Sequence, residues 1–170
     1  MTITQQMIDY FSIRTREHID RVTRNMIALE GFQGLSHQEL MQRALIHDQS
    51  KYEQDEYEPY IWLTEFHRCK QSGVPFEYPG DMKEQVHKAI QHHYANNAHH
   101  IVNKKTSELD LIEKVCDWTA MSQELNQNNG SCFKYYQENK DKFRLSQAQK
   151  EFIEKVIQEL NKRLNVQEDL

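Results

Sequence analysis

The sequence is organised around Arg43-Ala44-Leu45-Ile46-His47-Asp48-Gln49-Ser50-Lys51, in which a histidine and an aspartate follow an apolar helical run. Upstream, Ser36 and Glu39 form a capping-box pattern, which predicts that a helix begins there. A neutral imidazole and a carboxylate are both good ligands for a divalent cation, and a helix end lets adjacent side chains turn toward one point. The pair therefore indicates either a metal site or, in the simpler interpretation, a capped helix end.

Two further predicted helices carry side chains that bind metals on their inner faces. Residues 4–30 form an amphipathic helix whose apolar stripe includes His18, and residues 107–125 form a helix whose stripe adjoins Asp117. A buried histidine can be satisfied by a carbonyl, so His18 alone does not establish a site. A buried carboxylate is costly unless it is paired or bound to a metal, so Asp117 favours one.

A histidine-rich segment closes the predicted helix at residues 81–94 and continues beyond it. Helical spacing places His93 on the inner face of that helix and His92 at the edge of this face. The asparagines at 96 and 97 break the helix, so His99 and His100 follow in irregular backbone. These histidines indicate metal ligands or substrate contacts. The alternative is an exposed polar loop that binds metals adventitiously.

The composition predicts one all-α domain of about six to seven helices that spans residues 1–170. With 38% hydrophobic residues, five glycines and three prolines, the chain lacks the turn residues typical of a β architecture. Residues of roughly 10–125 would carry the metal site, and helices within 131–165 would pack against it. The predicted helices are 4–30, 36–48, 53–71, 81–94, 107–125, 131–140 and 146–165, and residues 73–80 form a loop that borders a cleft.

Charge and cysteine content exclude several classes of protein. The net charge of −5 argues against a surface that binds an extended nucleic acid. The three cysteines are dispersed and form no CxxC motif, which predicts neither a disulfide framework nor a zinc knuckle and favours the reducing cytoplasm. Charged residues throughout 1–30 exclude the core of a signal peptide, and no apolar run is long enough to span a membrane.

The order of these residues resembles the H…HD…D ligand set of the HD-domain superfamily of metal-dependent phosphohydrolases. More narrowly, the strings 47–51, 92–100 and 110–118 look like a family of phage and bacterial HD-like proteins, catalogued only as a domain of unknown function. The likeness covers roughly residues 10–125 and implies an HD-like helical bundle. It also implies a first metal ion held by His18, His47, Asp48 and Asp117.

In members of the superfamily with two ions, the aspartate of the tandem pair bridges them, and the resemblance then implies a second ion held by His93 with His99 or His100. These histidines lie six or seven residues apart, closer together in sequence than in two-metal members. His67 with His92 or His93 would restore the wider separation. The resemblance thus implies one or two divalent ions, namely manganese, iron, cobalt, magnesium or zinc.

The expected activity is hydrolysis of a nucleotide or related small phosphoester by metal-activated water. Asp48 or Asp117 would accept the proton of the water, and Lys51 with His92 or His100 would neutralise the phosphate or protonate the leaving oxygen. Glu56 could orient these groups. Two alternatives remain open: a di-iron oxygenase of the HD type, and a non-catalytic protein that binds a nucleotide. The oligomeric state cannot be inferred from the sequence.

Overall fold

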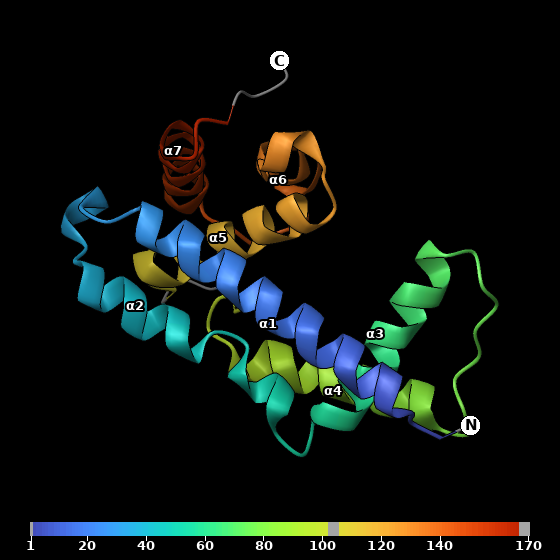
Figure 1. Ribbon diagram of the computed structural model, residues 1–170. Coiled ribbons are helices and arrows are strands. Elements are labelled where there is room, and N and C mark those ends of the chain that lie inside the picture. Colours follow the sequence, from blue (N-terminus) through green and yellow to red (C-terminus); the bar gives the residue numbers. More distant parts are fainter. Residues whose placement is uncertain (1, 102–105, 167–170) are drawn as a thin grey trace. The chain divides into compact units, whose positions relative to one another are not determined.

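The computed structural model describes residues 2–101 and 106–166, which form helices and no strands (Figure 1). The α-helices are α1 (Gln5–Ala28), α2 (His37–Ile46), α3 (Tyr57–Gln71), α4 (Met82–Asn96), α5 (Glu108–Glu124), α6 (Phe133–Asn139) and α7 (Gln147–Arg163). Short 3-10 turns occur at Phe32–Gly34, Gln49–Tyr52 and Asn128–Gly130. The prediction of an all-α fold with six to seven helices is confirmed. Among the described helices, none combines the length and the apolar character needed to cross a membrane.

The chain divides into two compact units that are discontinuous in sequence. The first contains Asp48–Asn97 together with the chain up to Glu17, and the second contains His18–His47 together with the chain from Ala98 onward. Helix α1 contributes to both units, and the peptide bond between His47 and Asp48 joins them. The prediction of one domain over residues 1–170 stays a prediction.

In the first unit, α3 packs against α4 and the two are joined by the loop that the sequence predicts (Figure 1). The prediction that α3 begins near residue 53 is wrong, because the acidic residues there follow a 3-10 turn and the helix begins only at Tyr57. Pro59 lacks an N–H donor and therefore fits the first turn of α3. The core of this unit is Met7, Phe11, Tyr60, Ile61, Trp62, Met82, Val86 and Ala89.

In the second unit, α5 packs against α7, and apolar side chains of α1 and α2 complete the core. The predicted capping box at Ser36 and Glu39 is present, and Ser107 caps α5 in the same way. Both caps satisfy backbone N–H groups at the starts of helices that lead to site residues. The fully buried core side chains include Val22, Met26, Leu40, Val115, Cys116, Tyr136, Ile153 and Leu160.

Helix α2 ends immediately before the tandem His47-Asp48 pair. Asp48 adopts the left-handed conformation, with φ 57° and ψ 14°, and so turns the chain sharply. Aspartate tolerates this region better than most residues other than glycine. As a result both side chains of the pair are buried, at 1% and 2% exposure, instead of only one of them facing inward.

Candidate metal centre

His18, His47 and Asp117 converge in the second unit. Each offers one ligand atom, and the three atoms lie within 4.8 Å of one another. His18 Nε2 is 3.1 Å from Asp117 Oδ1, and His47 Nε2 is 3.4 Å from His18 Nε2. The residues come from α1, from the end of α2 and from α5, so elements distant in sequence supply one group of donors.

The spacing of these donor atoms fits a divalent metal ion. With metal–nitrogen bonds of about 2.1 Å, adjacent ligand atoms are about 3.0 Å apart around an octahedral ion and about 3.4 Å apart around a tetrahedral one. The separations of His18 Nε2 from Asp117 Oδ1 and from His47 Nε2, 3.1 and 3.4 Å, fall within this range, and all three ligand atoms lie within 4.8 Å of one another. Two imidazoles and one carboxylate suit zinc, iron and manganese alike. The donor set therefore fits the ion that the resemblance implies without selecting one metal.

Glu113 orients two of the histidines of this unit. Its Oε1 lies 2.7 Å from His47 Nδ1 and 3.1 Å from His99 Nδ1. A carboxylate only accepts hydrogen bonds, so both Nδ1 atoms carry the hydrogen and both neutral rings keep their lone pair at Nε2. The contacts of His47, His99 and Glu113 are thus hydrogen bonds that fix tautomers, as is usual behind metal-binding histidines.

The ionisation of the buried Glu113 and the partly buried Asp117 follows from these contacts. Burial alone would raise the pKa of Glu113, but the hydrogen bonds from His47 and His99 outweigh it and hold the pKa well below the ordinary range. Burial also opposes ionisation of Asp117, yet the hydrogen bond that it accepts from His18 Nε2 and the nearby imidazoles hold its pKa far below normal. A metal ion bound to His18 Nε2 would take the place of that hydrogen. Both side chains are therefore anionic at neutral pH, the form that attracts a cation.

Arg43 completes the support of the site, and sequence reasoning did not assign it a role. Its guanidinium bonds to both Asp110 and Glu113. A signal for this arrangement exists, since Arg43 precedes His47 by four residues and Glu113 precedes Asp117 by four. Residues so spaced share a helix face, so matching polar faces of α2 and α5 meet. Glu113 itself was also missed.

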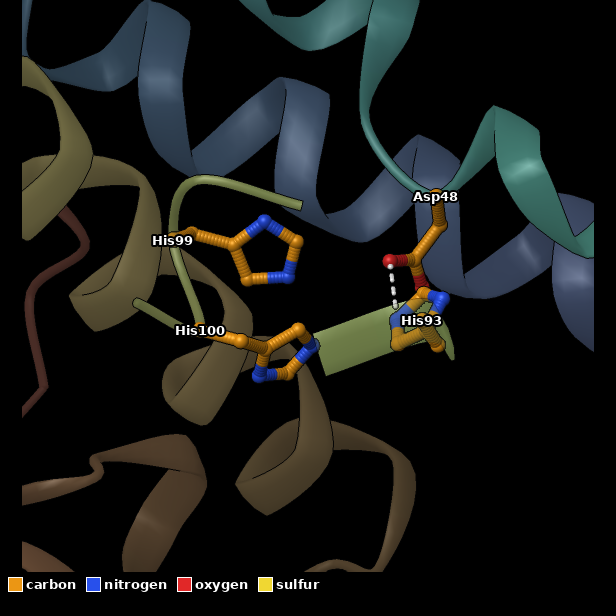
Figure 2. A group of neighbouring side chains, drawn as sticks. All are labelled: Asp48, His93, His99 and His100. Atoms are coloured by element: carbon orange, nitrogen blue, oxygen red, sulfur yellow. Dashed lines mark ion pairs between the residues drawn. The ribbon is translucent and has the colours of Figure 1, made fainter. Parts of the chain in front are cut away.

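The first unit holds a second polar cluster around Asp48. The Asp48 carboxylate pairs with Lys51 Nζ at 2.6 Å and with His93 Nε2 at 3.2 Å, the latter contact being the dashed line in Figure 2. The Lys51 ammonium also lies over the ring of Tyr60, 5.4 Å from its centroid. The structure thus brings together three residues that the sequence predicts for the site, and holds Asp48 by two cationic or hydrogen-bonding partners.

Glu56 plays the orienting part in this second cluster. It is fully buried and accepts from His92 Nδ1 at 2.8 Å, from His93 Nδ1 at 2.9 Å and from the Ser50 hydroxyl at 3.0 Å. Burial works against ionisation of Glu56, but these donors lower its pKa. Burial likewise opposes the charge of His93, yet its hydrogen bonds with Asp48 and Glu56 raise its pKa above 6.5. Two carboxylates therefore stabilise the protonated form of His93.

The remaining predicted residues fall into different environments. Figure 2 shows His99 and His100 consecutive in the loop after α4, where their ring centroids are 4.0 Å apart; His99 is buried and His100 is partly exposed. His67 is exposed on α3 with its ring beside Phe66, which argues against its use as a ligand. The assignment of a second ion to His93 with His99 or His100 stays a prediction.

The family model for a family of unknown function, DUF5662, matches residues 7–159. The chain belongs to this family. The match spans α1 through most of α7 and includes each residue of both clusters described above. Comparisons with curated proteins and with solved structures give no match. Membership in DUF5662 therefore does not assign an activity, and the site residues carry the functional argument.

Replacing Glu113 by glutamine tests its orienting role. The amide cannot accept from both imidazoles and pair with Arg43, so we expect metal affinity to fall about 10- to 100-fold. The free energy of unfolding should fall by about 3 kcal/mol, since the partly buried Arg43 guanidinium and two buried imidazoles lose a charged partner. Calorimetry with Zn²⁺ and urea unfolding at pH 7 measure the two effects. The control is Glu108→Gln at the exposed first turn of α5; equal behaviour of both variants would contradict the role.

Replacing Glu56 by glutamine should lower the pKa of His93, because one of the two carboxylates that stabilise the imidazolium is lost. A raised pKa stabilises the fold fully below 6.5, and this stabilisation disappears as the pH rises through the pKa of folded His93. The free energy of unfolding of Glu56→Gln should therefore decrease less than that of the wild type as the pH rises through this range. NMR titration of His93 in chelator checks the prediction. Asp55→Asn is the control, since Asp55 is exposed and lies 3.7 Å from His92; an unchanged His93 pKa in Glu56→Gln would refute it.

Proposed function

We propose that the protein is a metal-dependent hydrolase of phosphoester bonds that acts on a nucleotide or a related small phosphoester. The observation that carries the proposal is the convergence of His18 Nε2, His47 Nε2 and Asp117 Oδ1 at separations suited to one divalent ion. The resemblance of the ligand order to the HD superfamily supports phosphoester bonds as the target. The family match neither supports nor opposes this reaction.

The residues of the second unit would hold the ion and keep it in a defined electrostatic setting. His18, His47 and Asp117 bind it, and Glu113 keeps the Nε2 lone pair of His47 available. When bound, the ion supplies Lewis acidity, lowering the pKa of water and polarising a phosphoryl oxygen. Arg43 neutralises part of the surrounding negative charge through Asp110 and Glu113, so the acidic groups do not repel an anionic substrate as strongly.

The resemblance assigns the handling of protons and phosphate charge to Asp48, Lys51 and His92, which all belong to the first unit. Asp48 is buried and held by Lys51 and His93, and it serves as the proton acceptor. Lys51 and His92 remain 18% and 33% exposed in their side chains, so a substrate can reach both. The Lys51 ammonium would compensate phosphate charge, and His92, whose Nδ1 is tied to Glu56, would protonate a leaving oxygen from Nε2. His100, partly exposed, is the second candidate for that step.

The first test measures metal content and turnover of the untagged protein and of Asp117→Asn. We expect about one or two ions per chain in the wild type, and phosphate release from at least one nucleotide with manganese, cobalt or magnesium. Asp117→Asn should lose both, since a neutral amide is a weak ligand. Glu108→Gln is the control, because Glu108 lies at an exposed position on the same helix. It should retain the metal.

Several outcomes would overturn the hydrolase. Iron at two per chain with oxygen-dependent activity would favour the oxygenase, and tight nucleotide binding without turnover across these metals would favour a binding protein. Full metal content in Asp117→Asn would show that Asp117 is not a metal ligand and would refute the proposed metal site.

The second test concerns Asp48 and uses asparagine in place of alanine. Asparagine tolerates the left-handed conformation at this position, so Asp48→Asn removes the negative charge without straining the backbone. We expect the turnover number to fall about 10²- to 10⁴-fold, as for loss of a general base. Gln49→Ala, at the exposed neighbouring position, should leave turnover unchanged. Wild-type turnover in Asp48→Asn would show that another group accepts the proton.

A further inference from the structure

The first unit contains a pocket of about 700 Å³ between α3, α4 and the loop that joins them. Binding sites for small molecules typically have volumes of this size. The pocket shares no residue with the two polar clusters described above, and the loop is the one that the sequence predicts to border a cleft. Its lining consists of Leu63, Phe66, Phe76, Glu77, Tyr78, Gly80, Lys83, Val86, His87 and Ile90.

Three aromatic side chains form one wall of the pocket. The ring centroids of Phe66 and Phe76 are 5.8 Å apart, those of Phe66 and Tyr78 are 5.8 Å apart, and those of Phe76 and Tyr78 are 4.9 Å apart at an interplanar angle of 87°. All three residues stay partly exposed in the folded unit. Edge-to-face clusters of this kind offer ring faces on which a further aromatic group gains contact energy. The wall therefore favours a planar aromatic ligand over a flexible chain.

The polar side of the pocket carries Lys83, for which the described residues show no ion pair. Lys83 and His87 lie one turn apart on α4, and the residues three and four positions from Lys83 include no acid. By contrast Lys88, on the same helix, pairs with Glu84 at 2.8 Å. Glu77 also lines the pocket, yet among the described residues no ion pair joins it to Lys83. The exposed Lys83 ammonium is thus available to an anionic group at the rim of a mostly apolar pocket.

We propose that this pocket binds a small planar aromatic molecule with one anionic group, the rings lying against Phe66, Phe76 and Tyr78 and the anion facing Lys83. The proposal does not rest on the proposed hydrolase. In this arrangement His87 lies beside the bound anion and can donate a hydrogen bond to it. The Glu77 carboxylate, which also lines the pocket, repels the anion. This combination predicts substitutions with effects of opposite sign.

The experiment compares two fluorescent probes that differ by a single charged group. 1-Anilino-8-naphthalenesulfonate is an aromatic anion, and N-phenyl-1-naphthylamine is its uncharged counterpart. We expect saturable binding of the sulfonate at one site per chain. Lys83→Gln should weaken it about fivefold, as for loss of a charge-assisted hydrogen bond, and Glu77→Gln should strengthen it about twofold. Neither substitution should change binding of the uncharged probe.

Two controls locate the site and guard against unfolding. Lys88→Gln removes a charge from the same helix outside the pocket and should leave both affinities unchanged. In the wild type, NMR shifts caused by the sulfonate should concentrate in residues 63–90. The thermal unfolding transition of each variant should remain cooperative, which separates site binding from dye uptake by a loosened core.

Equal effects of Lys83→Gln and Lys88→Gln would overturn the proposal, as would a loss of affinity for the uncharged probe that matches the loss for the sulfonate. NMR shifts outside the pocket, or several equivalent sites per chain, would overturn it equally. None of these readouts depends on metal content or turnover, so they stand apart from the test of the hydrolase.

Discussion

The buried carboxylate of Glu113 is the constraint on which the second unit depends. It accepts hydrogen bonds from the Nδ1–H groups of two imidazoles and forms an ion pair with a guanidinium. One side chain therefore orients His47, His99 and Arg43. An unpaired carboxylate at 2% exposure would cost several kcal/mol, and each partner therefore helps to hold α2, the loop after α4 and α5 in place. The same bonds leave the His47 lone pair at Nε2, beside His18 and Asp117. The fold of the second unit and its candidate metal site therefore depend on the same ionised carboxylate.

The first unit repeats this device with different residues. Glu56 is likewise buried, likewise accepts from two imidazoles through Nδ1, and so keeps Nε2 of His93 directed at Asp48. Each unit thus uses a carboxylate that is not itself a predicted ligand to orient its histidines. The His47-Asp48 peptide bond joins the two arrangements in the chain, and the left-handed backbone at Asp48 allows both side chains of the pair to be buried.

Helical periodicity was enough to predict much of this structure. It places His18, His93 and Asp117 on inner faces, and the capping boxes at Ser36 and Ser107 mark helix starts that the structure confirms. The predicted start of α3 was wrong because the acidic residues from Glu53 match a helix terminus. They lie instead in a non-helical segment between the 3-10 turn at Gln49–Tyr52 and Tyr57. The role of Glu113 could not be predicted, because it depends on which imidazoles contact this side chain in the tertiary structure. The spacing along α5 shows only that Glu113 and Asp117 share a face of the helix.

The most direct test of the account is anomalous diffraction from crystals grown with Mn²⁺, recorded with and without chelator. The account predicts a peak within bonding distance of His18 Nε2, His47 Nε2 and Asp117 Oδ1, with Glu113 retaining its hydrogen bonds to His47 and His99. A peak held instead by surface histidines such as His67 or His87, with the three donors still in contact with one another, would contradict it.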